Sequence, residues 1–277
     1  MITADLLSNA TFLAQAQAEY DQHRSGILSS NNALYAILPL STTMSPSEVT
    51  SILALATNLT NSSPKSARDQ LLDNTLLAQL NSTAIGQTEI LWGPRVFSAT
   101  APTQAGKTYL TLAAAGMLPW SRGSIHIVSS DPTIPPAIDP RVYSSQIDKE
   151  IMLASVRFTD KIAKTQPLAG YLVRRVEPAE GELSDEQWWA QIKNLTQTVK
   201  HPMGTCAMLP KEKGGVVDER LRVYGVKGLR VVDASVFPLH IAAHLQATVY
   251  AVAEKAADLI LDKDRDDDDD DGNGDDE

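Results

Sequence analysis

The sequence predicts an α+β fold, because segments with helical periodicity and short strand-like segments both occur along the chain. Apolar side chains recur at helical spacing in residues 3–23, from 45 onward, and in 66–80, 145–164, 183–198 and 245–261. Strand-like runs occupy residues 88–92, 124–128, 216–218, 221–226 and 228–235. A chain of 277 residues is long enough to bury a sizeable core, in one large domain or two modest ones.

Local signals place several of these elements. Ser45 is the expected N-cap of the second helix, with Pro46 as its first helical residue and Glu48 closing a capping box. In the run 124–128, Ile125 and Ile127 fall on one face of a strand. The four prolines that follow, at positions 132, 135, 136 and 140, predict an extended connection without helix.

The negative charge is concentrated at the C-terminus. The chain carries a net charge of −10, and residues 262–277 contain eleven acidic and two basic side chains, so the remainder is almost neutral. A neutral body gives no electrostatic basis for binding nucleic acid or an anionic membrane. The acidic tail, 262–277, repels itself and is predicted to be disordered; calcium capture by its aspartates is an alternative.

Cysteine usage and hydropathy exclude several classes of protein. Cys206 is the only cysteine, so the chain forms no intrachain disulfide and no multi-cysteine metal site. No apolar run reaches the roughly 18 residues that a transmembrane helix needs. The first residues do not resemble a signal peptide, yet sequons occur at Asn9, Asn58, Asn61, Asn81 and Asn194. Sequons without a signal peptide indicate a secreted ancestry and a native N-terminus that lies upstream of Met1.

A series of motifs occupies the last sixty residues before the tail. They are His201-Pro-Met-Gly-Thr-Cys-Ala-Met, Gly215-Val-Val-Asp218, Leu221-Arg-Val-Tyr-Gly-Val-Lys-Gly-Leu-Arg-Val-Val-Asp-Ala-Ser235, and Ala243-His244 before the final helix. In order and spacing they resemble the C-terminal signature of the glucose-methanol-choline (GMC) oxidoreductases, most closely the fungal glucose oxidases and aryl-alcohol oxidases. Two upstream segments, 121–132 and 137–141, resemble the family's substrate domain. The resemblance covers nearly all of the chain except the tail.

The resemblance implies a division of the chain. Residues 1–200 would form a substrate-binding domain with an antiparallel sheet and helices, and residues 201–261 would supply the C-terminal strand and helix of an FAD-binding domain. The sequence contains no Gly-X-Gly-X-X-Gly motif, which in this family cradles the pyrophosphate of FAD. The N-terminal Rossmann half of the FAD-binding domain is therefore missing from the sequence, and we expect the apolar face of the last helix to be exposed.

The resemblance also implies the site. Alcohol oxidation needs a group that accepts the hydroxyl proton, and imidazole suits this role near neutral pH. His201 matches the family's base and His244 its partner, which binds the substrate hydroxyl and shares the proton. By themselves, the two residues could equally be a turn histidine and a helix-start histidine. No metal site is predicted, because no acid or cysteine accompanies His240 and His244.

The cofactor-binding residues are implied in the same way. Asp233 and Ala234 match positions that contact the ribityl-phosphate side of FAD. Leu245, Gln246 and Thr248 open the last helix, whose N–H groups would face the flavin edge that gains negative charge on reduction. The same residues would serve equally as a capping aspartate and an ordinary helix start.

The function implied is FAD-dependent oxidation of the CH–OH group of an alcohol or sugar, with the chain present as a C-terminal fragment. The alternative is a catalytically inactive truncated fragment that serves at most as a substrate-domain or interaction module. The expected partners are the small-molecule substrate and, through exposed FAD-domain surface, a second copy of the chain. The resemblance and the sequons imply a secreted protein.

Overall fold

The computed structural model describes residues 2–30, 34–62, 64–98, 100–101, 103–178 and 180–270, with side chains described as far as Leu261. The chain divides into two compact units that alternate along the sequence. The first unit comprises residues 1–55, 80–117 and 145–197, and the second comprises 56–79, 118–144 and 198–277. The last division, at 197, lies close to the predicted boundary at 200, but two upstream segments also belong to the second unit. The fold is mixed helix and sheet, as predicted.

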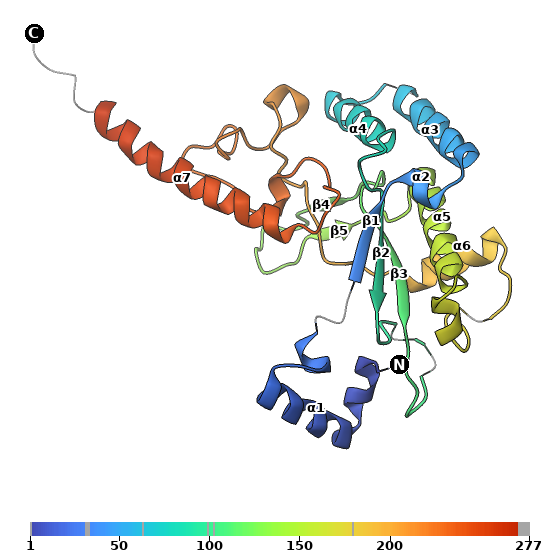
Figure 1. Ribbon diagram of the computed structural model, residues 1–277. Helices are drawn as coiled ribbons and strands as arrows, with labels where there is room; N and C mark the ends of the chain where they lie inside the picture. The colour runs from blue at the N-terminus through green and yellow to red at the C-terminus, as the bar shows by residue number, and fades with distance from the viewer. Residues whose placement is uncertain are drawn as a thin grey trace, which may run out of the picture. The chain divides into compact units, whose positions relative to one another are not determined.

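A three-stranded antiparallel sheet forms the centre of the first unit (Figure 1). Its strands are β1 (Leu34–Leu38), β2 (Thr88–Gly93) and β3 (Thr111–Gly116), in the spatial order β1-β2-β3. The helix α5 (Gln146–Ala163) packs against β2 and β3. Its apolar face supplies Ile147, Ile151 and Leu153, each at most 5% exposed. Burial of such side chains is the main favourable term that holds helix to sheet.

The other helical elements of the first unit lie before β1, between β1 and β2, and after β3 in the sequence. They are η1 (Ala4–Ser8), α1 (Ala10–His23), η2 (Ile27–Ser29), α2 (Leu40–Thr43), the start of α3 (Pro46–Asn61), η3 (Leu168–Tyr171) and α6 (Asp185–Leu195). The single helix expected over residues 3–23 is in fact two elements. The Asn9 side chain accepts a hydrogen bond from the Phe12 backbone N–H at 3.1 Å, so Asn9 caps α1 and separates it from η1.

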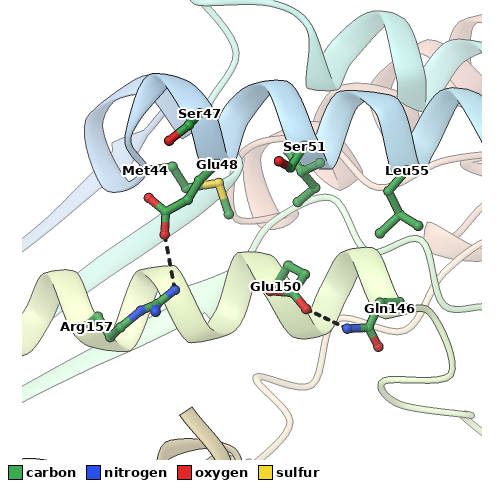
Figure 2. A pocket seen from close by; sticks show the side chains of 9 residues that line it. Met44, Ser47, Glu48, Ser51, Leu55, Gln146, Glu150 and Arg157 are labelled. Carbon is green, nitrogen blue, oxygen red and sulfur yellow. Dashed lines mark hydrogen bonds and ion pairs between the residues drawn. The ribbon is translucent and has the colours of Figure 1, made fainter. Parts of the chain in front are cut away.

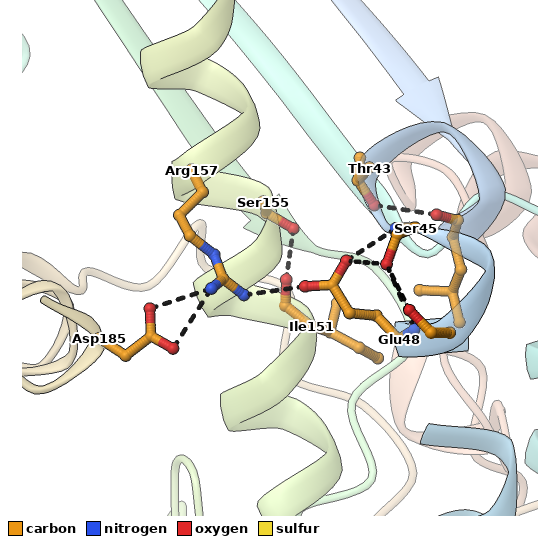
Figure 3. A network of polar contacts seen from close by, with 9 residues as sticks. Thr43, Ser45, Glu48, Ile151, Ser155, Arg157 and Asp185 are labelled. Atoms are coloured by element: carbon orange, nitrogen blue, oxygen red, sulfur yellow. Dashed lines mark hydrogen bonds and ion pairs between the residues drawn. The ribbon is translucent and has the colours of Figure 1, made fainter. Parts of the chain in front are cut away.

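The predicted capping box at Ser45 is confirmed. The Ser45 N–H donates to Glu48 Oε2 at 2.7 Å, and the Glu48 N–H donates to Ser45 Oγ at 3.4 Å. Figure 3 shows how Arg157 of α5 then joins two helix starts, with Nη1 3.0 Å from Asp185 and Nη2 3.4 Å from Glu48. Both acids sit in first helical turns, where the helix dipole favours negative charge. All three side chains are more than a third exposed, so these pairs contribute little stability individually.

A buried hydroxyl pair fastens β2 to α5. Thr88 Oγ1 lies 2.8 Å from Ser155 Oγ, and Ser155 donates to the Ile151 carbonyl at 2.6 Å. Because the single hydroxyl hydrogen of Ser155 is already used, Thr88 must be the donor in the bond between them. The two residues are 0% and 1% exposed, so no water can replace either partner.

We expect Ser155→Ala to lower the free energy of unfolding by about 1–3 kcal/mol, because it leaves the Thr88 hydroxyl buried without an acceptor. Urea unfolding followed by circular dichroism measures this. The double variant Thr88→Val/Ser155→Ala removes both hydroxyls and should recover part of the loss. Equal stability of Ser155→Ala and the unmodified chain would contradict the assignment.

The second unit combines the end of α3 with α4 (Ala67–Leu80, as far as residue 79), the hairpin β4 (Ser124–His126) and β5 (Ala137–Asp139), η4 (Lys211–Lys213), η5 (Ala234–Val236) and α7 (Gln246–Asp270). Its core cluster contains Val217, Leu221, Val236, Phe237 and Ala256, with Val249 and Val252 packed against it. The apolar face of α7, expected to be exposed, is therefore partly buried: Val249, Val252 and Ala256 pack against the segment that carries the predicted motifs. Leu261, 64% exposed, lies outside this cluster.

The prediction of strands between residues 216 and 235 is wrong. The structure contains only isolated bridges there, which pair Met208 with Val217, Val217 with Val223, and Arg222 with Arg230. The reason is local. Asp218 Oδ1 accepts the backbone N–H groups of Arg220 and Arg222, both at 2.9 Å, which diverts donors that a ladder would need. Leu221 has a φ of +63°, which further interrupts an extended strand.

The segment predicted to be a disordered tail begins inside α7, whose backbone the structure continues to Asp270. Once a helix has formed, each added residue gains one backbone hydrogen bond, which favours continuation. Residues 271–277 lie outside the described residues.

Within the described part of the chain, no helix combines the length and apolar character needed to cross a membrane.

Candidate functional site

The two predicted catalytic histidines meet in the second unit. His201 Nε2 lies 3.0 Å from His244 Nδ1, although 43 residues separate them in the sequence. The rings are edge to face, with centroids 5.2 Å apart and planes at 80°. His201 is half-buried and His244 is exposed. The structure therefore places two imidazoles in one hydrogen-bonded pair that solvent or a ligand can reach.

The pair has a defined capacity for protons. One of the two facing nitrogens must donate and the other must accept, because each ring nitrogen is either a donor or an acceptor. A first added proton goes to an outward nitrogen and leaves the bond intact. A second would place two N–H groups against each other. The pair can therefore take up one proton without losing the hydrogen bond between the rings.

Backbone contacts fix the turn that carries His201. Lys200 and Gly204, on either side of it, have φ values of +60° and +85°. Downstream, the Cys206 N–H donates to the Ser235 carbonyl at 2.9 Å and the Met208 N–H donates to the Val236 carbonyl at 2.8 Å. These bonds connect the histidine turn to η5 and to the core beneath it.

The residues predicted to contact the ribityl-phosphate side of FAD lie at η5. Asp233 is the N-cap of this short helix, and its Oδ1 accepts the Ser235 N–H at 2.8 Å. Asp233 is exposed and Ala234 is half-buried. The carboxylate therefore caps a turn, as in the alternative interpretation, and is still accessible from outside.

The residues predicted to face the flavin ring open α7 immediately after His244. Leu245 is 5% exposed and anchors the helix start, while Gln246 is exposed and Thr248 is half-buried. The Leu245 carbonyl accepts the Val249 N–H at 2.9 Å, the first helical bond here. The N–H groups at the start of an α-helix have no intrahelical acceptor, so this end can receive a ligand with partial negative charge.

The remaining histidine of this segment has a local role. His240 Nδ1 lies 3.1 Å from the Ile241 carbonyl, and the ring is half-buried. Among the residues that the structure describes, no group of three His, Cys, Asp or Glu side chains could hold a metal ion.

One contact to the histidine turn was missed by sequence reasoning. Arg68 of α4 donates from Nη2 to the Gly204 carbonyl at 3.2 Å across 136 residues, and no local pattern signals such a contact.

The motif Gly215-Val-Val-Asp218 has a structural role. Asp218 receives the two backbone N–H groups of Arg220 and Arg222 on one oxygen, and Nε and Nη2 of Arg222, both at 2.8 Å, on the other. Burial would raise the pKa of Asp218, but the hydrogen bonds from Arg222 and Arg220 outweigh it and hold the pKa below its ordinary value of 3.8. The charged form of Asp218 therefore stabilises the turn.

The lowered pKa of Asp218 predicts an acid dependence of stability. A carboxyl group whose pKa is lower in the folded state contributes its full stabilisation above the unfolded-state pKa and loses it as pH falls through the folded-state value. We expect the melting temperature to fall less between about pH 5 and pH 3 in Asp218→Asn than in the unmodified chain. Thermal melts across this range measure the difference, and parallel curves would refute the role of this carboxylate.

A shallow groove in the first unit does not contain any predicted site residue. It has a volume of about 420 Å³ and lies between α3 and α5 (Figure 2). Its charged and amide side chains are engaged with one another, Glu48 with Arg157 and Glu150 with Gln146. Leu55 contributes to its apolar part. The groove is therefore separate from the histidine pair in composition and in the unit to which it belongs.

Comparison with known proteins agrees with the motif-based resemblance. The family model described as GMC oxidoreductase, for the C-terminal domain, matches residues 119–253. The dehydrogenase citC of Monascus ruber is 31% identical over 280 aligned positions, covering 94% of this chain and 44% of its own length. The glucose oxidase-like protein fsoC of Humicola fuscoatra is 39% identical over 145 positions, covering 52% of this chain and 25% of its own.

Solved structures agree with these sequence matches. An FAD-dependent oxidoreductase from Chaetomium thermophilum superimposes with a TM-score of 0.80 at 28% identity, covering 95% of this chain and 45% of its own. A fungal aryl-alcohol oxidase gives 0.70 at 31% identity, covering 94% and 44%. The chain thus spans less than half the length of either protein. Its motifs, its fold and these relatives together place the chain in the GMC oxidoreductase family, with residues 119–253 matching the family's C-terminal domain.

Proposed function

We propose that this chain carries the catalytic histidines of an FAD-dependent oxidoreductase that acts on the CH–OH group of an alcohol or sugar. The observation that supports this most directly is the 3.0 Å contact between His201 Nε2 and His244 Nδ1. Two imidazoles in one accessible pair form a base that accepts one proton, and their positions match the family motifs. The chain spans about 44% of the length of the citC dehydrogenase, so the activity of a whole enzyme is part of the proposal.

Each histidine has a proposed role in this chemistry. The alcohol loses the proton of its hydroxyl group and a hydride from the carbon that bears this group, and becomes a carbonyl compound. His201 accepts the proton, and His244 binds the hydroxyl oxygen and shares the charge through the bond between the rings. When bound, FAD supplies the acceptor for the hydride. Either histidine can act as the base when the other is removed.

The residues present fit one end of FAD. Leu245, Gln246 and Thr248 would hold the ring edge that becomes negative on reduction, because the start of α7 offers N–H donors beside His244. Asp233 and Ala234 would contact the ribityl-phosphate side. The sequence has no glycine motif for the pyrophosphate, so we assign no residue to that part of the cofactor.

The visible absorbance spectrum of the purified chain tests this proposal. We expect a flavin band that survives desalting after FAD is added, and that bleaches when an alcohol such as benzyl alcohol, or glucose, is added without oxygen. A retained band that no alcohol or sugar bleaches would refute the catalytic role. A colourless protein would refute cofactor binding by this chain and favour the alternative, a catalytically inactive fragment.

The proposal extends to location and association. All five sequon asparagines are exposed, which supports a secreted, glycosylated protein, and a loss of mass on glycosidase treatment of native material would test it. Apolar side chains are exposed in the segment 201–261 that would belong to the FAD-binding domain, among them Tyr250 at 65% and Leu261 at 64%. Such surface favours self-association. Elution as a monomer on a sizing column would count against it.

A further inference from the structure

The histidine turn depends on a few contacts for its conformation. Gly204, three residues after His201, has a φ of +85°, and a Cβ added to it would lie 3.3 Å from the Phe237 carbonyl oxygen. Gly204 thus has a left-handed backbone conformation close to His201. The orientation of the His201 ring therefore depends on the orientation of the peptide that follows Gly204. The bonds from Cys206 and Met208 to the η5 segment hold the chain only after this point.

Arg68 binds the peptide that follows Gly204, which the bonds of Cys206 and Met208 do not reach. Its Nη2 donates to the Gly204 carbonyl at 3.2 Å, so a charged donor fixes the direction of that carbonyl. The stem of Arg68 runs along Gly214, where an added Cβ would lie 3.5 Å from both Cβ and Cδ of the arginine. Arg68 thus connects α4, the turn at Gly214 and the histidine turn.

The support beneath Arg68 is well fixed. α4 begins at Ala67, directly after Ser66, whose Oγ accepts the Asp69 N–H at 3.0 Å. Lys65, just before this cap, lies 2.6 Å from Asp73, and both side chains are at most 15% exposed. Arg122 joins the same carboxylate at 3.7 Å. A helix start held by partly buried ion pairs is a stable base for a side chain that positions another segment.

We propose that Arg68 is a positioning residue for the His201–His244 pair. This rests on the proposed function, since the pair matters for catalysis only if it is the base. The hydrogen bond of Arg68 goes to the Gly204 carbonyl rather than to a histidine ring. Its bond to Gly204 keeps the turn in the conformation in which His201 Nε2 meets His244 Nδ1. Loss of the bond lets the turn relax, and the imidazole pair then separates or exchanges between arrangements.

Nitrogen-15 NMR of the histidine rings in the full chain tests this without FAD or alcohol. In the unmodified chain we expect ring-nitrogen signals of two fixed tautomers joined by a hydrogen bond. In Arg68→Met, which keeps most of the stem and removes the donors, we expect loss of the hydrogen-bonded signal and tautomer-averaged shifts for both rings. Arg68→Lys, which restores a cationic donor, should recover part of the signal.

Controls separate this role from a general loss of structure. Arg222→Met removes an arginine of the same unit that binds Asp218 rather than the histidine turn, and should leave the histidine signals unchanged. If Arg68→Met does not fold, Arg68→Leu, which also removes the donors and keeps an apolar side chain, makes the same test. Unperturbed histidine signals in a folded Arg68→Met or Arg68→Leu would overturn the proposal. Absence of alcohol oxidation would refute the proposed function and leave this result unaffected.

Discussion

Replacing both histidines, in His201→Asn/His244→Asn, is expected to slow alcohol-dependent bleaching of bound FAD by about 10²- to 10⁴-fold, the range that general base catalysis supplies. Asparagine keeps hydrogen-bonding capacity but cannot take the proton at neutral pH. Each single variant should lose less, because the remaining imidazole still accepts the proton. His201→Asn should be the slower of the two singles, since His201 is the proposed base.

Anaerobic stopped-flow absorbance of the FAD-reconstituted chain measures these rates. His240→Asn is the matched control, because His240 lies in the same segment and its Nδ1 bonds to the Ile241 carbonyl. We expect that control to bleach at the rate of the unmodified chain. A double variant that bleaches within a few-fold of the unmodified rate would exclude the pair as the base, even though the rings lie 3.0 Å apart.

Gly215→Ala is expected to lower the free energy of unfolding by about 3 kcal/mol, the upper end of the usual range for overpacking, because the neighbouring atoms are backbone. A Cβ on Gly215 would lie 1.8 Å from the Leu209 carbonyl oxygen and 2.5 Å from its carbon, and both are backbone atoms. Relief requires a shift of the backbone. That shift would disturb the bonds from the Gly215 N–H to Pro210 at 3.1 Å and from the Val216 N–H to Ala207 at 2.9 Å.

Gly225→Ala is the matched control for this substitution. Gly225 has a φ of +80°, but an added Cβ would meet no atom within 4 Å. Its cost should be only that of a left-handed alanine, about 1–2 kcal/mol. Urea unfolding of both variants measures the difference. If Gly215→Ala unfolds at the same urea concentration as Gly225→Ala, the close approach of Leu209 does not determine the effect.

Some elements of this fold could be predicted because neighbouring residues determine them. The capping box at Ser45 and Glu48 joins residues three apart, so its pattern is complete in the sequence. The strand-like run at 88–92 and the helical pattern at 145–164 also correspond to elements of the structure, β2 and α5. The strands expected over 216–235 were wrong for a related reason, since the Asp218 side chain competes locally for the N–H groups of a ladder.

The sequence by itself determined the resemblance to the family, which two histidines match its motifs, and the starts of the main helices, because motifs and caps are short-range patterns. Only the tertiary structure decided that the rings of His201 and His244 meet, that Arg68 reaches Gly204, and that Thr88 binds Ser155. These partners lie 43, 136 and 67 residues apart. Burial of apolar faces brings such segments together, and this packing depends on the whole chain rather than on any local pattern.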